Sequence, residues 1–172
     1  MKKNFYGFII ILFFSCSTQK TTESISKEPL KNSFVFDYAG KLNQKQFDFI
    51  KTTYQWNNEK ILIINFRQPK SFCHFDHCEH YLKGNKWWRD FYSKVALESC
   101  QNLFVFSDKF RLDINIDDKN NFEDKNSFLL TNFFKKKKSC FGVMVLNERG
   151  GYFQFNGDYS QKQVASFIEN LK

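Results

Sequence analysis

Hydrophobic residues beyond about residue 33 follow two kinds of pattern, and each kind predicts its own type of element. Short apolar runs predict strands at 34–36, 61–66, 103–106, 141–146 and 152–155. Apolar residues spaced three and four apart predict helices over 42–54, 85–99 and 125–137, and a final helix after Ser160. The order of these elements predicts one α/β domain over residues 33–172.

Three stretches refine this picture. The run at 61–66 is almost wholly apolar, which predicts a central strand covered on both faces. A glycine-containing stretch at 147–151 predicts a hairpin turn between the last two strands, and alternating apolar residues at 112–116 predict an extra edge strand. The lysines at 135–138 suit a helix C-terminus, whose free carbonyls carry partial negative charge. We therefore interpret these lysines as a solvated helix end, not as a binding patch.

The first residues of the chain have a different pattern. Lys2 and Lys3 precede an apolar run at 8–14. That run is too short to span a membrane, which takes roughly 20 apolar residues. Positive charge followed by a short apolar run is typical of a secretory signal, predicted here over residues 1–15.

The end of this signal, at residues 13–16, reads Phe-Phe-Ser-Cys. It resembles the lipobox of bacterial lipoproteins, in which a small residue precedes a cysteine that receives a diacylglycerol. The resemblance implies that Cys16 is the lipid-anchored first residue of the mature protein. The chain would then be held on a membrane in the cell envelope, facing the periplasm or the exterior. Residues 16–32 are polar and are predicted to be a flexible tether.

Composition supports a folded domain and limits its partners. The chain has 172 residues, of which 19% are aromatic, and its 23 phenylalanines can fill a core. The formal net charge of +8 becomes 8 − 2 = +6 without Lys2 and Lys3. A positive surface tethered to a membrane is drawn toward anionic lipid. An export signal removes the chain from the genome, so no nucleic-acid partner is expected.

The cysteine count is the first indication of chemistry. With Cys16 carrying lipid, four cysteines remain in the domain: Cys73, Cys78, Cys100 and Cys140. An even number in an exported domain permits two disulfides, with three pairings open.

The stretch at 71–80 is the most unusual in the chain, because it holds Cys73, Cys78 and all three histidines. A reactive cysteine needs a lowered thiol pKa, which a helix N-terminus and a nearby histidinium both favour. One hypothesis is therefore thiol–disulfide exchange, in which Cys73 attacks and Cys78 resolves the mixed disulfide.

Two other interpretations of this stretch stay open. Imidazole and thiolate ligands suit Zn or Cu, and the candidate histidine ligands are His74, His77 and His80. Alternatively, the cysteines form structural disulfides in a non-enzymatic lipoprotein and the histidines are surface residues.

Three features together resemble the thioredoxin fold. They are the strand at 61–66 followed by a cysteine-bearing segment, the closing strand and turn at 143–150, and the order of elements. The resemblance implies a three-layer sandwich with a central mixed sheet of four to five strands flanked by helices. In that family two residues separate the reactive cysteines, whereas four separate Cys73 and Cys78 here. The family also places a cis-proline before the hairpin strands, where this chain has Ser139 or Cys140.

The function that the resemblance implies is that of a membrane-anchored thiol–disulfide oxidoreductase. Cys73 would be its nucleophile, with Cys78 or Cys140 as partner. Its substrates would be envelope proteins with thiols or disulfides, and it would need no cofactor. The alternative is the non-enzymatic lipoprotein, with or without bound Zn or Cu.

Overall fold

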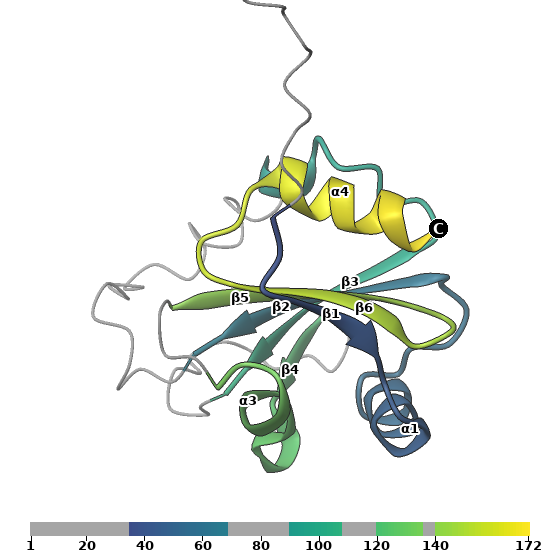
Figure 1. Cartoon of the computed structure of the whole chain (residues 1–172), viewed down its shortest axis with the longest axis vertical. Helices are drawn as coiled ribbons and strands as arrows, with labels where there is room; N and C mark the ends of the chain where they lie inside the picture. Colours follow the sequence, from purple (N-terminus) through teal and green to yellow (C-terminus); the bar gives the residue numbers. More distant parts are fainter. Residues whose placement is uncertain (1–34, 69–89, 108–119, 136–139) are drawn as a thin grey trace, which may run out of the picture. The chain divides into compact units, whose positions relative to one another are not determined.

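A mixed six-stranded sheet runs through the part of the chain that the computed structural model describes, residues 35–68, 90–107, 120–135 and 140–172 (Figure 1). Its strands are β1 (Tyr38–Lys41), β2 (Ile61–Arg67), β3 (Cys100–Phe106), β4 (Asn121–Glu123), β5 (Phe141–Asn147) and β6 (Gly151–Asn156). They lie in the order β1-β6-β5-β2-β3-β4. Strands β2, β3 and β4 are parallel, and β5, β6 and β1 are each antiparallel to a neighbour. The predicted α/β class and mixed sheet are confirmed.

Helices cover both faces of this sheet. Figure 1 shows α1 (Gln44–Thr53) and α3 (Phe128–Asn132) on one face and α4 (Gln161–Leu171) on the other. Strand β2 supplies alternate residues to the two cores: Leu62, Ile64 and Phe66 lie in the cluster with α1 and α3, whereas Ile61 and Ile63 lie in the cluster with α4. The predicted burial of this strand on both faces, and the layered arrangement, are therefore confirmed. No helix of the described ranges is long and apolar enough to cross a membrane.

The predicted number of four to five strands was too low, because β4 adds a sixth strand, and the other sheet edge also differs from prediction. The first strand begins at Tyr38, not at 34–36, and the apolar side chains of Val35 and Phe36 are 51% and 41% exposed. Backbone pairing with β6, which aligns Tyr38 with Gln154, sets the strand's position. At the other edge, the three residues of β4 pair with β3. Three residues are too few for a recognisable hydrophobic period. The strand predicted at 112–116 lies outside the described residues.

Two predicted helices end early. Residues 90–92 are helical and 93–95 form a turn, so the helix predicted over 85–99 stops near Tyr92; residues 85–89 lie outside the described ranges. The helix predicted over 125–137 begins as a 3-10 turn, η3 (Lys125–Ser127), and α3 ends at Asn132. Phe133 and Phe134 follow it and are buried under the sheet. Their backbone carbonyls accept from the side-chain amides of Gln154 and Gln68, so these carbonyls are bonded outside the helix.

The remaining predicted elements are confirmed. Helix α1 begins at a capping box, in which the Asn43 side chain accepts from the Gln46 backbone at 2.9 Å and the Gln46 side chain accepts from the Asn43 backbone at 3.2 Å. The predicted hairpin joins β5 and β6, and its Gly150 has φ +80, a conformation that favours glycine. Helix α4 carries the predicted apolar stripe of Val164, Phe167 and Ile168 into the core.

Gly142 of β5 provides a stability prediction. An added Cβ would lie 2.5 Å from Cε1 of Phe134, and that ring is fully buried and stacked on Phe66 with centroids 4.3 Å apart. Because the ring has no room to withdraw, Gly142→Ala is expected to lower the free energy of unfolding by about 1–3 kcal/mol in urea denaturation. Gly40→Ala is the matched control, since its Cβ would meet the Tyr152 ring at an ordinary 3.4 Å. Equal losses in the two variants would contradict the predicted clash.

Candidate functional site at the Cys140 end of the sheet

Polar residues gather where β2 and β3 end and β5 begins. Arg67 of β2 pairs with Phe141 of β5, so Gln68 lies beside Cys140 and its backbone N–H donates to the Cys140 carbonyl at 3.0 Å. Ser107 follows β3, and its backbone N–H donates to the Arg67 carbonyl at 3.1 Å. We call this group of four residues, Arg67, Gln68, Ser107 and Cys140, the Cys140 end. The carboxyl ends of parallel strands are the usual place for a site in an α/β sheet.

The sulfur of Cys140 is disulfide-bonded, and the residue is only partly buried. Cys100 is a free thiol at the start of β3, and burial raises its pKa. Cys100 pairs with Ile61, the first residue of β2, whereas Cys140 lies beside the last residues of β2. Because β2 has seven residues, the two cysteines are about 20 Å apart. Because the Cα atoms of a disulfide lie within about 7 Å, a Cys100–Cys140 bridge is excluded. The four domain cysteines therefore do not form the two disulfides that their even number permits.

Two buried oxygens at the Cys140 end find no hydrogen-bond partner in the described structure, Oε1 of Gln68 and Oγ of Ser107. Gln68 is 1% exposed, and its side-chain amide donates to the Phe134 carbonyl at 3.0 Å. Leaving a buried polar atom unpaired costs about 1–3 kcal/mol, so such atoms are few in folded proteins. In the described residues, the side-chain oxygens of Tyr54, Gln101 and Asn156 are further examples. Those of Gln68 and Ser107 lie beside the disulfide-bonded Cys140.

A positive charge also lies at this end. The Arg67 guanidinium carbon is 5.0 Å from the centre of the Phe141 ring, and Phe141 is the neighbour of Cys140 in the chain. The same guanidinium acts to lower the pKa of the Tyr159 phenol, although burial of that phenol outweighs it and raises the pKa overall.

The predicted Cys73 and Cys78, and the candidate metal ligands His74, His77 and His80, lie outside the described residues, as do the signal at 1–15, Cys16 and the tether. The structure does place the residues on either side of the cysteine- and histidine-bearing stretch. Gln68 precedes it, and Tyr92 follows it with its hydroxyl donating to Asn65 of β2 at 2.5 Å. Asn65 and Gln68 are three positions apart on an extended chain, about 10 Å. Both flanks of the stretch are therefore attached to the carboxyl-terminal half of β2.

Metal binding gains no support from the residues that the structure places. Within the described ranges, no group of three or more histidine, cysteine or carboxylate side chains is arranged to hold a metal ion. The proposed Zn or Cu ligands lie outside those ranges, so the metal hypothesis stays a prediction.

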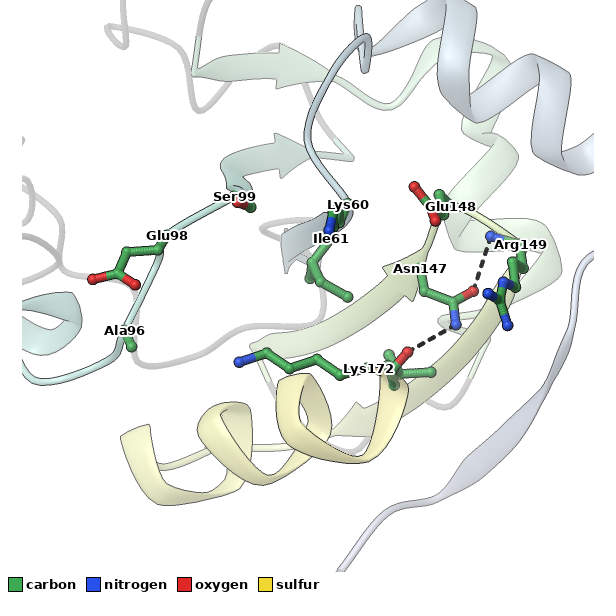
Figure 2. A pocket seen from close by; sticks show the side chains of 10 residues that line it. Lys60, Ile61, Ala96, Glu98, Ser99, Asn147, Glu148, Arg149 and Lys172 are labelled. Atoms are coloured by element: carbon green, nitrogen blue, oxygen red, sulfur yellow. Dashed lines mark hydrogen bonds between the residues drawn. The ribbon is translucent and has the colours of Figure 1, made fainter.

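A hollow lies at the end of β2 opposite to the Cys140 end (Figure 2). It measures about 400 Å³, and its charged lining residues are Lys60, Glu98, Glu148, Arg149 and Lys172. Asn147 beside it is fully used in structural contacts: its side chain accepts from the Arg149 and Gly151 backbones and donates to the Leu171 carbonyl. In the described structure, no buried side-chain atom of this hollow lacks a partner, in contrast to the Cys140 end.

No family model, curated protein or solved structure matches this chain. The fold alone does not identify an activity, because one fold serves many functions. Function therefore has to be inferred from the chemistry of the chain's own residues, and the Cys140 end carries the most distinctive chemistry that the structure places.

Cys140 was a predicted site residue through the thioredoxin resemblance, whereas Gln68 and Ser107 were not predicted. Both are polar residues directly after apolar strands, and that position was the available signal. Neither residue type is unusual after a strand, so the signal became informative only once their side-chain oxygens proved buried.

Proposed function

We propose that this chain is a thioredoxin-like thiol–disulfide oxidoreductase of the cell envelope, held to a membrane through lipid on Cys16. Cys140 is one sulfur of its redox couple, and Cys73 or Cys78 is the other. The observation that carries the proposal is that Cys140, a partly buried and disulfide-bonded residue, lies at the carboxyl ends of β2 and β3 beside Gln68, after which the cysteine-bearing stretch follows in the chain.

The arrangement of elements supports the proposed family. The parallel β2–β3 pair, the antiparallel β5–β6 hairpin and the closing helix α4 follow the order on which the resemblance to thioredoxin rests. Cys140 stands directly before β5, where the family has the cis-proline that faces its reactive cysteines. No peptide bond of the described residues is cis, so this chain would place a sulfur where the family uses a proline.

The proposed reaction is a two-electron exchange. A substrate thiolate attacks one sulfur of the Cys140 disulfide, forming a substrate–protein disulfide and releasing the second sulfur of the couple as a thiolate. A second substrate thiolate then attacks the mixed disulfide and releases the remaining protein thiolate. The substrate dithiol has become a disulfide, and the protein couple has gained two electrons and two protons as a pair of thiols. A second disulfide compound returns the couple to its oxidised form.

The exchange depends on the sulfurs themselves, since a leaving sulfur departs faster as its thiol pKa falls. Envelope proteins with exposed thiols or disulfides are the substrates of matching chemistry.

The direct test is catalysis by the full chain in detergent. A peptide dithiol and glutathione disulfide are mixed with the chain, and formation of the peptide disulfide is followed by mass spectrometry. We expect at least about a tenfold rate increase over the same concentration of free cysteine, because the protein positions its sulfurs and favours the thiolate. A rate equal to that of free cysteine would contradict the proposal and favour a structural disulfide in a non-enzymatic lipoprotein.

A further inference from the structure

The hollow at the far end of β2 from Cys140 is walled by four separate parts of the chain. They are the start of β2, the end of β5 with the hairpin turn that follows it, the segment before β3, and the end of α4. Its volume of about 400 Å³ lies in the range of roughly 300–1,000 Å³ that small-molecule sites have in proteins. The hollow is therefore large enough for a small ligand.

Hydrogen bonds join these walls to one another. The Glu148 N–H donates to the Lys60 carbonyl at 3.1 Å, and the first N–H of β2 donates to the Ser99 carbonyl at 3.3 Å. The Asn147 side chain donates to the Leu171 carbonyl at 3.0 Å, which connects the end of β5 to the end of α4 (Figure 2). Because its walls are bonded together, the hollow is preformed, and a preformed site loses less conformational freedom when a ligand binds.

Charged side chains of both signs surround the hollow. The cationic residues are Lys60, Arg149 and Lys172, each from a different wall, and the acidic residues are Glu98 and Glu148. All five are exposed. Among these described residues, no hydrogen bond or ion pair joins two of the charged side chains (Figure 2). Their charges do not neutralise one another in pairs, so both signs are available to a ligand.

We infer that this hollow binds a small zwitterion, namely a short peptide with a free ammonium and a free carboxylate. The cationic side chains pair with the peptide carboxylate, and Glu98 and Glu148 pair with its ammonium. A ligand of one sign would also face like charges, which oppose binding, whereas a zwitterion offers each sign its opposite. Because the charged residues stand on separate walls, a peptide with charges at its two ends fits them better than a single amino acid. This inference does not depend on the proposed function.

The test is calorimetric titration of the full chain in detergent with alanyl-alanine, for which we expect saturable binding. Replacing the three cationic residues of the hollow with glutamine should weaken that binding about tenfold or more, since exposed ion pairs are individually weak but three are lost together. The control makes the same change in net charge at three exposed lysines that do not line the hollow, Lys45, Lys51 and Lys162. It should bind within about twofold of wild type.

Two further probes test whether both end charges matter. N-acetyl-alanyl-alanine lacks the ammonium and alanyl-alanine amide lacks the carboxylate, and we expect each to bind about threefold or more weakly than alanyl-alanine. Equal binding of the acetylated probe would overturn the zwitterion and indicate a site for anions. Absence of saturable alanyl-alanine binding would overturn the inference, as would an equal loss in the two triple variants, because that loss would follow overall charge. None of these titrations measures thiol exchange, so their failure leaves the proposed function untouched.

Discussion

Replacing Cys140 with serine is expected to slow the exchange reaction of the full chain by roughly 100-fold or more, because a residue that forms the covalent intermediate cannot be replaced by its neighbours. Serine has nearly the shape of cysteine, but its hydroxyl is not ionised near neutral pH and forms no disulfide. The partly buried position of Cys140 accepts the smaller oxygen without a clash. The measurement is the initial rate of peptide disulfide formation in the assay with glutathione disulfide.

Cys100→Ser is the control for this loss. Cys100 is a free thiol at the other end of the sheet, and its pKa is raised, so it is a poor nucleophile. Its replacement should leave the rate within about twofold of wild type, because it lies about 20 Å from the Cys140 end. An equal loss of rate in both variants would show that the activity follows general thiol content, not the geometry around Cys140.

Phe134→Ala is expected to have the largest effect on stability, lowering the free energy of unfolding by about 3–5 kcal/mol. The ring is fully buried and stacked nearly parallel on Phe66, with an interplanar angle of 6°. It also lies directly over Gly142, where an added Cβ would meet it. Alanine would leave a cavity where the Phe134 ring now lies, between the Phe66 ring and Gly142. Urea denaturation of the full chain measures the loss.

A double-mutant cycle with Gly142→Ala tests whether the ring is the cause. Removing the ring removes the clash, so the added methyl should cost little in the Phe134→Ala background. We expect the two changes to be non-additive by about 1 kcal/mol or more. Phe134→Leu provides a milder background if the alanine variant does not fold. Strict additivity in both backgrounds would contradict the placement of Phe134 over Gly142.

The elements that the sequence predicted well are those whose hydrophobic period is set by burial. Strand β2 is apolar because both its faces are covered, and α4 has one apolar stripe because one face meets the sheet. β1 was misplaced because an edge strand with four exposed residues has no such period, and its backbone bonds to β6 decide where it lies. After α3 ends, the carbonyls of Phe133 and Phe134 bond to the distant side chains of Gln154 and Gln68, and spacing along the chain does not reveal such partners.

The candidate site was predictable only in part, for a related reason. Cys140 was predicted as a site residue because it precedes a strong strand signal, in a position that the thioredoxin resemblance marks. Cys100 lies at the other end of the sheet from Cys140 because the register of β2 and β3 pairs Cys100 with Ile61 and not with Arg67. The bonds that Asn65 accepts from the Tyr92 and Tyr159 hydroxyls could not be predicted from the sequence. A single asparagine in an apolar strand does not show which hydroxyls will reach it across the core.

A redox titration of the Cys140 disulfide tests the central claim most directly. The full chain is equilibrated in dithiol–disulfide buffers of stepped potential, free thiols are alkylated, and mass spectrometry reports the labelled fraction of Cys140. We predict a midpoint above about −300 mV, in the range of thiol–disulfide oxidoreductases, at roughly −270 to −120 mV. A Cys140 disulfide that stays fully oxidised in buffers below about −300 mV would contradict the account and identify the bond as structural.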